Sequence, residues 1–197
     1  MKYIVTTVLL LLSVSLFSQE NSKANFDKRE VYIEMRDGTK LFTAIYTPKD
    51  ISKDNKYPIL MERTCYSIAP YGEEKFQKHL GPNDFLQKDK YIFVYQDVRG
   101  RYMSEGVFTN MTPQVAHKTK KDIDESTDTY DTVDWLVKNI KNNNGKVGQY
   151  GTSYPGFYTA AGTIANHPAL VASSPQAPVS DFFFDDFHHN GAYLLSY

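Results

Sequence analysis

The sequence predicts an α/β fold in which a mostly parallel sheet follows an antiparallel hairpin. Apolar and polar residues alternate on both sides of Asp37-Gly38, which indicates two strands joined by a tight turn. Short apolar runs at 57–61, 91–95 and 147–150 have the length and composition of buried strands. Between the last two runs, apolar residues recur at helical spacing. Strands that alternate with helices favour parallel βαβ units.

Each expected element follows from such a local pattern. The first helix is predicted to start near Asp122 and to end at the run 142–145. Its apolar stripe consists of Tyr130, Val133, Val137 and Ile140. In chain order, the predicted segments are hairpin strands at 31–35 and 41–46, a strand at 57–61, a Gly- and Pro-punctuated excursion at 67–89, a strand at 91–95, an aperiodic stretch at 104–121, the first helix, a strand at 147–150, a second helix at 157–166 and a strand at 170–174.

Composition narrows the class of protein. A hydrophobic fraction of 41% and an aromatic fraction of 14% suffice for a packed core. A formal net charge of -1 argues against a nucleic-acid partner, which normally meets a basic face. The single cysteine, Cys65, rules out an intrachain disulfide framework and a multi-cysteine zinc site, and we expect it to be a small buried residue. We expect no cofactor and no metal.

The N-terminus has the layout of a secretory signal peptide. A lysine at position 2 precedes an apolar run that is too short to span a bilayer, and small residues follow before a polar segment. We expect residues 1–18 to be the signal peptide, with cleavage near Ser18, and 19–29 to be a polar leader. The alternative is an uncleaved membrane anchor. Nothing after position 20 resembles a membrane span, so the predicted location is secreted or periplasmic, with no membrane contact after cleavage.

Ser153 is the candidate catalytic nucleophile. Gly151-Thr152-Ser153 lies between a predicted strand and a predicted helix, the context of a nucleophile elbow. The usual pattern is Gly-x-Ser-x-Gly, but here Pro155 stands two places after the serine and the glycine comes later, at Gly156. Such a turn holds the serine in a strained, exposed conformation at a helix N-terminus. The alternative interpretation is a structural turn serine.

Several motifs in register with this turn resemble a family of serine hydrolases with the α/β-hydrolase fold. It includes X-Pro dipeptidyl-peptidases, cocaine esterase and the α-amino-acid ester hydrolases, and the last branch is the most similar. The resemblance covers about residues 30–197. The motifs are Gly145-Lys146-Val147-Gly148, Ser153-Tyr154-x-Gly156-Phe157, Asp97-Val98-Arg99-Gly100 with Ser104-Glu105-Gly106, 131–136, His167-Pro168-Ala169-Leu170, and Asp185-Asp186-Phe187 to Gly191-Ala192. The resemblance implies a sheet with helices on both faces.

The same resemblance implies two oxyanion donors. One is the backbone N–H of Tyr154, the residue after the nucleophile. The other is the hydroxyl of Tyr66, in Arg63-Thr64-Cys65-Tyr66, although the family usually has proline where Cys65 stands. A phenol O–H aimed at a forming alkoxide is a preorganised dipole. Without the resemblance, Tyr66 reads as an aromatic residue packed on a strand edge.

The cluster 185–189 holds two carboxylates and two imidazoles. Adjacent histidines point to different faces of a regular element, which disfavours a shared metal ion. The resemblance implies that Asp186 belongs to the carboxylates that bind the α-ammonium group of the substrate. A solvated helix N-terminus is the alternative for Asp186.

Outside these motifs, the charged and imidazole side chains predict little chemistry. We expect Asp97 and Arg99 to form a structural ion pair near a strand end. His79, His117 and His167 are lone histidines to which the sequence assigns no role.

The catalytic acid and base follow the nucleophile in the order Ser, Asp, His in this fold, and the resemblance implies that both lie beyond Tyr197. We therefore expect 30–180 to be the N-terminal part of an α/β-hydrolase domain and 181–197 the start of a helical cap, within a longer enzyme. The predicted function is hydrolysis of a small-molecule ester or short peptide, on α-amino-acyl or small acyl groups. A general acyl esterase, or a truncated inactive fragment that acts only as a binding module, is the alternative. Homo-oligomerisation of the full-length enzyme stays open.

Overall fold

The computed structural model describes residues 22–116, 119 and 121–195. The predicted signal peptide lies outside the described residues. Within them, no helix combines the length and the apolar character that a membrane crossing requires. The elements are β1 Phe26–Glu34, β2 Lys40–Pro48, β3 Tyr57–Thr64, α2 Asp84–Lys88, β4 Ile92–Asp97, α3 Glu125–Asn139, β5 Asn143–Thr152, α4 Tyr154–Thr163, β6 Leu170–Gln176, the π-helix η1 Phe183–Phe187, β7 His188–His189 and β8 Ala192–Tyr193.

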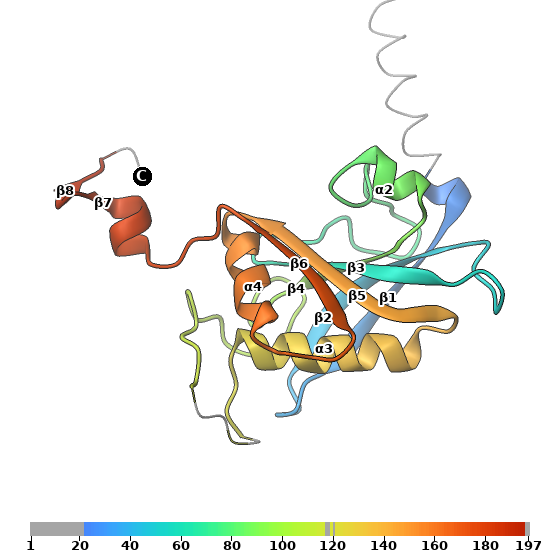
Figure 1. The fold of residues 1–197 in the computed structure, drawn as a ribbon, viewed down its shortest axis with the longest axis horizontal. Helices are drawn as coiled ribbons and strands as arrows, with labels where there is room; N and C mark the ends of the chain where they lie inside the picture. The colour runs from blue at the N-terminus through green and yellow to red at the C-terminus, as the bar shows by residue number, and fades with distance from the viewer. Residues whose placement is uncertain (1–21, 117–118, 120, 196–197) are drawn as a thin grey trace, which may run out of the picture.

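Six strands form one sheet in the order β1-β2-β4-β3-β5-β6 (Figure 1). β1 and β2 form the predicted antiparallel hairpin, and β2 is also antiparallel to β4. The strands β4, β3, β5 and β6 run parallel to one another. Gly38 closes the hairpin with φ +84°, a conformation that glycine adopts without strain. The predicted fold class is confirmed.

Alternating side chains along the strands bury both faces of the sheet. On one face, Val133 and Leu136 of α3 pack against apolar side chains of β1 to β5. On the opposite face, the long connection between β3 and β4 supplies Phe76 and Leu80, and α2 lies within this connection. Figure 1 shows α3 along one side of the sheet and α2 on the other. The short helix α2 was not predicted, because its five residues carry too little periodicity.

The structure corrects the predicted apolar stripe of the first helix. α3 begins at Glu125 and is capped by the side chain of Asp124. Tyr130, a predicted member of the stripe, is 37% exposed, whereas Thr132 is completely buried. A threonine is tolerated there because Gln96 of β4 donates a side-chain hydrogen bond of 3.0 Å to it. Periodicity of apolar residues could not reveal this polar contact.

Both elements that flank the candidate nucleophile begin earlier than predicted. β5 starts at Asn143, so part of the asparagine run that was expected to end a helix is already strand. α4 starts at Tyr154 rather than at residue 157, and Pro155 lies in its first turn. Ser153 alone makes the bend between strand and helix, and proline suits the first turn because its missing N–H has no helical partner there.

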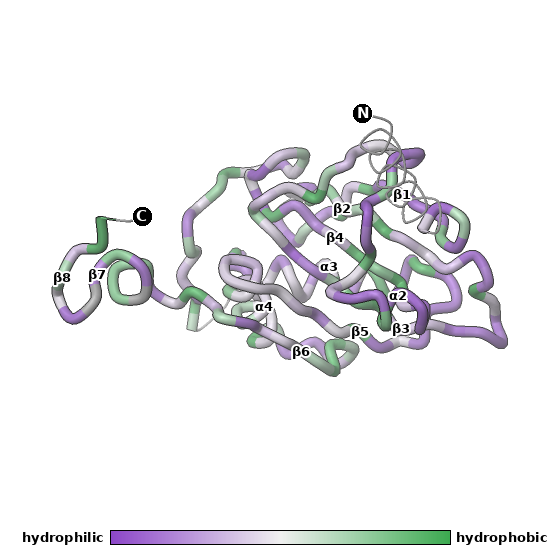
Figure 2. The backbone as a smooth tube through the Cα atoms, turned by 90° about the horizontal axis from the view of Figure 1, so that it is seen from above, coloured by the Kyte–Doolittle hydropathy of each residue, from purple (hydrophilic) through white to green (hydrophobic). Residues whose placement is uncertain are grey.

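After β6 the chain leaves the sheet. The π-helix η1 is followed by a small antiparallel hairpin of β7 and β8. Figures 1 and 2 both show this segment standing to one side of the sheet, far from α2. The predicted helical cap and the predicted domain boundaries stay predictions.

A buried arginine joins the two central parallel strands to α3. Arg63, the penultimate residue of β3, has a side chain that is 2% exposed. Its Nε donates to Gln96 Oε1 at 2.8 Å, and its Nη1 donates to Thr129 Oγ1 at 3.0 Å. Glu125 Oε2 lies 3.2 Å from Nη1, and Asp128 Oδ2 lies 3.7 Å from Nη2. This network fixes the end of β3 just before Tyr66.

We predict that Arg63→Met destabilises the full-length protein by about 3–5 kcal/mol at neutral pH, because it leaves the buried Glu125 without its cation. Burial raises the pKa of Glu125, and the charge of Arg63 opposes that rise. Loss of Arg63 in the variant should therefore raise the pKa of Glu125 further. Protonation of Glu125 in the folded state then restores part of the stability as the pH falls. Urea unfolding at pH 8 and pH 5 measures both effects.

The matched control is Arg36→Met. Like Arg63, Arg36 connects the sheet to α3, but it lies in the β1–β2 hairpin turn and its pair with Asp131 is partly exposed. Its loss should be about 1 kcal/mol or less. Equal losses for the two variants, or an Arg63→Met loss that does not shrink at low pH, would contradict the assignment.

Candidate active site

Ser153 stands at the sharp turn between β5 and α4. Its backbone has φ 63° and ψ −122°, a region that side-chain-bearing residues rarely occupy. Its N–H donates to the Gln176 carbonyl of β6 at 3.0 Å, and its carbonyl accepts the Phe157 N–H at 3.0 Å. The residue is exposed to solvent. The local fold therefore presents a serine hydroxyl beside a helix N-terminus.

Two glycines make this turn sterically feasible. A Cβ at Gly151 would lie 2.3 Å from the Pro155 carbonyl oxygen, and a Cβ at Gly156 would lie 2.5 Å from the Gln176 carbonyl oxygen. Both contacts are with backbone atoms, which cannot give way as a flexible side chain can. Gly156, three positions after the serine, thus meets the requirement for a small residue. Glycine is needed at this position because the first turn of α4 passes close to the end of β6.

Tyr66 lies two residues beyond the end of β3, and its side chain is beside Ser153. The Tyr66 ring meets the Tyr154 ring edge-on with centroids 6.3 Å apart, which places the Tyr66 side chain next to the elbow. Burial raises the pKa of Tyr66, the neighbouring Cys65 and Asp186 raise it further, and the nearby Ser153 hydroxyl lowers it in part. A raised pKa keeps the phenol protonated at neutral pH, so that it can donate a hydrogen bond.

Tyr154 is the first residue of α4, so its N–H is one of the groups that have no partner within the helix. Its side chain is held from another part of the chain. The Tyr154 hydroxyl donates to Asn110 Oδ1 and accepts the N–H of Met111 at 2.9 Å. The sequence missed Asn110 and Met111, which lie in a stretch with no periodicity or motif.

Asp186 belongs to η1, near its end and not at its N-terminus, which removes the solvated N-terminus interpretation. Its negative charge raises the pKa of Tyr66. The segment contacts the elbow through Phe182, whose ring centroid is 5.7 Å from that of Tyr154. The structure thus brings Tyr66 to the elbow of Ser153 and Tyr154, and it places the segment that carries Asp186 against Tyr154 through Phe182.

Several other predicted roles can be compared with the structure. Arg99 and Asp97 do not pair with each other, and that prediction was wrong: the Arg99 guanidinium binds Asp128 and Asp37, with closest contacts of 2.7 and 2.6 Å. Asp97 instead accepts the Tyr71 hydroxyl at 2.9 Å and the Ile68 N–H at 3.0 Å. β4 ends at Asp97 and Arg99 lies in the turn that follows, so the two side chains leave different parts of the backbone and reach different partners.

The cysteine and the remaining residues singled out in the sequence either have structural contacts or lie outside the described residues. Cys65 is buried, as predicted. His167, to which the sequence assigned no role, is buried against the Tyr130 ring, with centroids 4.6 Å apart. His117 and the side chains of Asp185 and His189 lie outside the described residues. Among the described side chains, no group of three or more His, Cys, Asp or Glu residues is placed to hold a metal ion, and no histidine is hydrogen-bonded to Ser153.

The chain is similar in sequence and in fold to several known hydrolases. The family model of X-Pro dipeptidyl-peptidase (S15 family) matches residues 37–196. Cocaine esterase of Rhodococcus sp. (strain MB1 Bresler) is 28% identical over 166 residues, which are 83% of this chain and 26% of the esterase. A solved α-amino acid ester hydrolase is 40% identical with a TM-score of 0.74, over 86% of this chain and 28% of that one. A solved aminopeptidase from a marine sediment archaeon, Thaumarchaeota archaeon, is 41% identical with a TM-score of 0.75, over the same shares of the two chains.

These relatives are much longer than this chain of 197 residues. The chain spans about a quarter of the cocaine esterase that it matches, and a similar share of the two solved relatives. The matched region contains the elbow and both predicted oxyanion donors. The predicted catalytic Asp and His, beyond Tyr197, stay predictions.

The elbow glycines generate a direct test in the full-length protein. Gly151→Ala should cost about 1–3 kcal/mol of stability, because its Cβ overlaps backbone atoms of Pro155. Gly148→Ala, in the same strand, is the matched control: the nearest atom to its Cβ would be Leu60 Cδ1 at 3.5 Å, an ordinary contact. Thermal or urea unfolding distinguishes the two variants. Equal stabilities would contradict the close approach described for the elbow.

Proposed function

The chain belongs to the X-Pro dipeptidyl-peptidase (S15) family, and we propose that the full-length protein is a serine hydrolase that cleaves esters or amides through an acyl-enzyme on Ser153. The observation that carries the proposal is the strained, exposed Ser153 at a strand-to-helix turn, with the Tyr66 side chain packed against the next residue, Tyr154. A structural turn serine needs no such neighbour.

In the proposed reaction, Ser153 Oγ attacks the carbonyl carbon and gives its proton to a histidine base supplied by the longer protein. The carbonyl oxygen becomes an oxyanion, which the Tyr154 N–H and the Tyr66 O–H stabilise. The leaving alcohol or amine takes the proton back as the acyl-enzyme forms. Water then attacks the acyl-enzyme and releases the acid. The raised pKa of Tyr66 supports its role as a donor throughout the cycle.

The substrate class we propose is an acyl group that bears a free α-amine. Of the two solved relatives at about 40% identity, one is named an α-amino acid ester hydrolase and the other an aminopeptidase, and both names denote substrates that carry an amino group. Asp186 supports this choice, because it lies in η1, the segment that contacts Tyr154 through Phe182, and its negative charge raises the pKa of Tyr66. A partly buried ammonium requires such a fixed counter-charge.

The second candidate is a general acyl esterase. The similarity to cocaine esterase, over 83% of this chain, favours it, because that relative is named for an ester substrate. The two candidates differ in one respect that can be measured, namely whether the α-amine of the substrate contributes to turnover.

We predict that a fluorophosphonate probe labels the full-length protein and that Ser153→Ala abolishes labelling and ester turnover. The reason is that no other hydroxyl is placed at a strained helix N-terminus within the described residues. The control is Ser174→Ala, which alters an exposed serine on the adjacent strand β6 and should keep full labelling. Labelling that survives in Ser153→Ala would remove the proposed function.

For Asp186→Asn, we predict slower hydrolysis of phenylglycine methyl ester and unchanged hydrolysis of phenylacetic acid methyl ester. The two esters differ only in the α-amine, and the lost ion pair should reduce kcat/KM on the first by roughly tenfold or more. Asp181→Asn is the control, since the amide oxygen can still accept the Phe183 N–H that Asp181 binds at 2.8 Å. Equal loss on both esters would make Asp186 a structural residue. A parent enzyme that does not distinguish the esters would leave the general acyl esterase.

A further inference from the structure

The segment between β4 and α3 carries a motif, Asp97-Val98-Arg99-Gly100 with Ser104-Glu105-Gly106, to which the proposed reaction gives no role. In the structure this segment folds back on itself as a compact loop. The Gly100 N–H donates to the Glu105 carbonyl at 2.9 Å. A Cβ at Gly100, where φ is +69°, would lie 2.0 Å from the Phe108 nitrogen, so only glycine fits there.

The loop is anchored on the sheet beyond the end of β4. Ser104 Oγ donates to the Asp97 carbonyl at 2.6 Å and accepts the Phe42 N–H at 2.8 Å. Glu105 exchanges two hydrogen bonds with Lys40, one through its N–H at 2.9 Å and one through its carboxylate at 3.0 Å. These bonds continue the pairing of β2 after β4 has ended. The loop thus extends the hydrogen bonding of the sheet beyond the end of β4.

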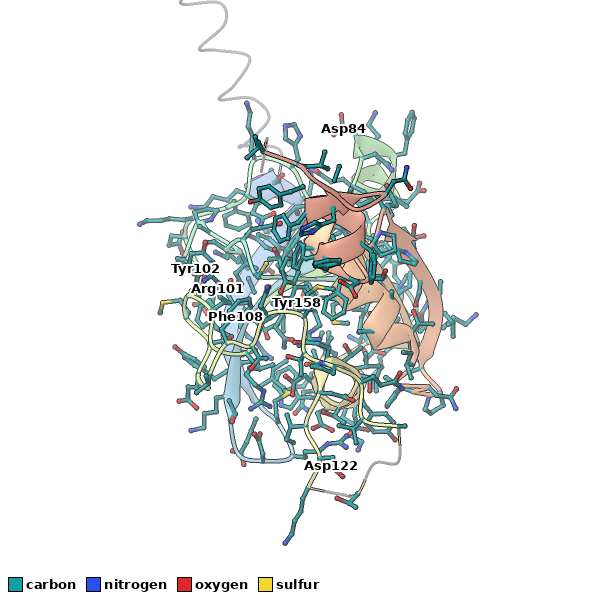
Figure 3. The ribbon with its side chains drawn as sticks, turned by 90° about the vertical axis from the view of Figure 1, so that its left-hand side faces the viewer. Asp84, Arg101, Tyr102, Phe108, Asp122 and Tyr158 are labelled. Carbon is teal, nitrogen blue, oxygen red and sulfur yellow. The ribbon has the colours of Figure 1, made fainter. Side chains whose placement is uncertain are left out.

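From this loop, the side chain of Arg101 reaches the peptide bond that precedes Tyr66. Its Nε donates to the Cys65 carbonyl at 3.1 Å. The guanidinium lies between two aromatic rings, 5.1 Å from the Tyr102 centroid and 5.0 Å from the Phe108 centroid. Figure 3 shows these three side chains gathered at the end of the molecule that also carries Tyr158 of α4.

Arg101 therefore fixes one of the two polar atoms of a single peptide unit. The other, the Tyr66 N–H, donates to Thr64 Oγ1 at 3.0 Å. With both atoms held, the plane of the peptide is set, and so is the direction in which the Tyr66 side chain leaves the backbone. This matters because Tyr66 is 60% exposed and has few contacts of its own to orient it.

We infer that Arg101 is a positioning residue, which holds the Tyr66 hydroxyl in the geometry of an oxyanion donor through the Cys65 carbonyl. The inference rests on the proposed function of Ser153 and Tyr66. The chain that follows the loop supports it, because Asn110 and Met111 hold the hydroxyl of Tyr154, whose N–H is the other proposed donor. One segment without regular structure thus contacts Tyr154 and the peptide unit that precedes Tyr66.

A double-mutant cycle in the full-length protein, with p-nitrophenyl acetate as substrate, tests this inference. Tyr66→Phe should lower kcat by about 10²–10³-fold, the usual effect of a lost oxyanion donor. Arg101→Met should lower kcat by about tenfold with little change in KM, because a displaced donor costs rate more than binding. In the Tyr66→Phe background, Arg101→Met should cost less than about twofold, since the hydroxyl that it positions is already absent.

Two further variants make the result specific. Arg101→Lys keeps the charge but loses the planar donor, and its smaller loss of kcat should likewise vanish in the Tyr66→Phe background. It also serves if Arg101→Met does not fold. Arg29→Met is the matched control: Arg29 also lies over an aromatic ring, 5.8 Å from the Trp135 centroid, but it belongs to β1 and contacts nothing at the elbow. It should leave kcat unchanged in both backgrounds.

Equal losses from Arg101→Met in the two backgrounds would show a general effect on the fold or on the electrostatic field, and would overturn the inference. An unchanged kcat in the parent background would overturn it as well. If Tyr66→Phe has no effect while Ser153→Ala abolishes turnover, the oxyanion assignment and this inference both fail but the nucleophile stands. If Ser153→Ala retains turnover, the proposed function itself has failed.

Discussion

The close approach of three backbone segments at the elbow is the constraint on which the candidate site depends. The end of β5, the first turn of α4 and the end of β6 meet within contact distance, and only glycine fits at 151 and 156. The N–H of Ser153 donates to β6, so the third strand takes part in the turn itself. The positive φ of Ser153 follows from this crowding. The strain is therefore a consequence of packing, and the exposed hydroxyl is its result.

A second constraint holds the end of β3, the strand next to β5 in the sheet. Tyr66 meets Ser153 only if β3 ends at the right height relative to β5, and the buried side chain of Arg63 secures that end against α3 and β4. The cation has hydrogen-bond acceptors and two carboxylates around it, so its charge is compensated out of water, although Arg63 Nη2 and Glu125 Oε2 make no hydrogen bond within the described residues. Burial of such a network costs more than an apolar core would. Its hydrogen bonds tie the end of β3 to Gln96 of β4 and Thr129 of α3.

Much of the fold could be predicted because it depends on local patterns. The hairpin, the four parallel strands and the two larger helices all follow from periodicity and turn residues, and Ser153 follows from the strand–turn–helix context. What the sequence could not show depends on contacts between distant segments. The burial of Thr132 depends on Gln96, and the partners of Arg99 lie 62 and 29 residues away. No periodicity records such pairs, and the expected pairing of Arg99 with Asp97 failed for this reason.

The aperiodic segment between β4 and α3 shows the same limit most clearly. Regular elements repeat their contacts every few residues, so their sequences repeat as well. A loop that holds particular atoms, such as the Cys65 carbonyl and the Tyr154 hydroxyl, makes each contact once, and its sequence has no period to detect. Its glycine at position 100 and its paired Ser104 and Glu105 are explained by the backbone that they fit. In this protein the residues closest to the proposed chemistry are thus supported by the part of the chain whose sequence pattern predicts least.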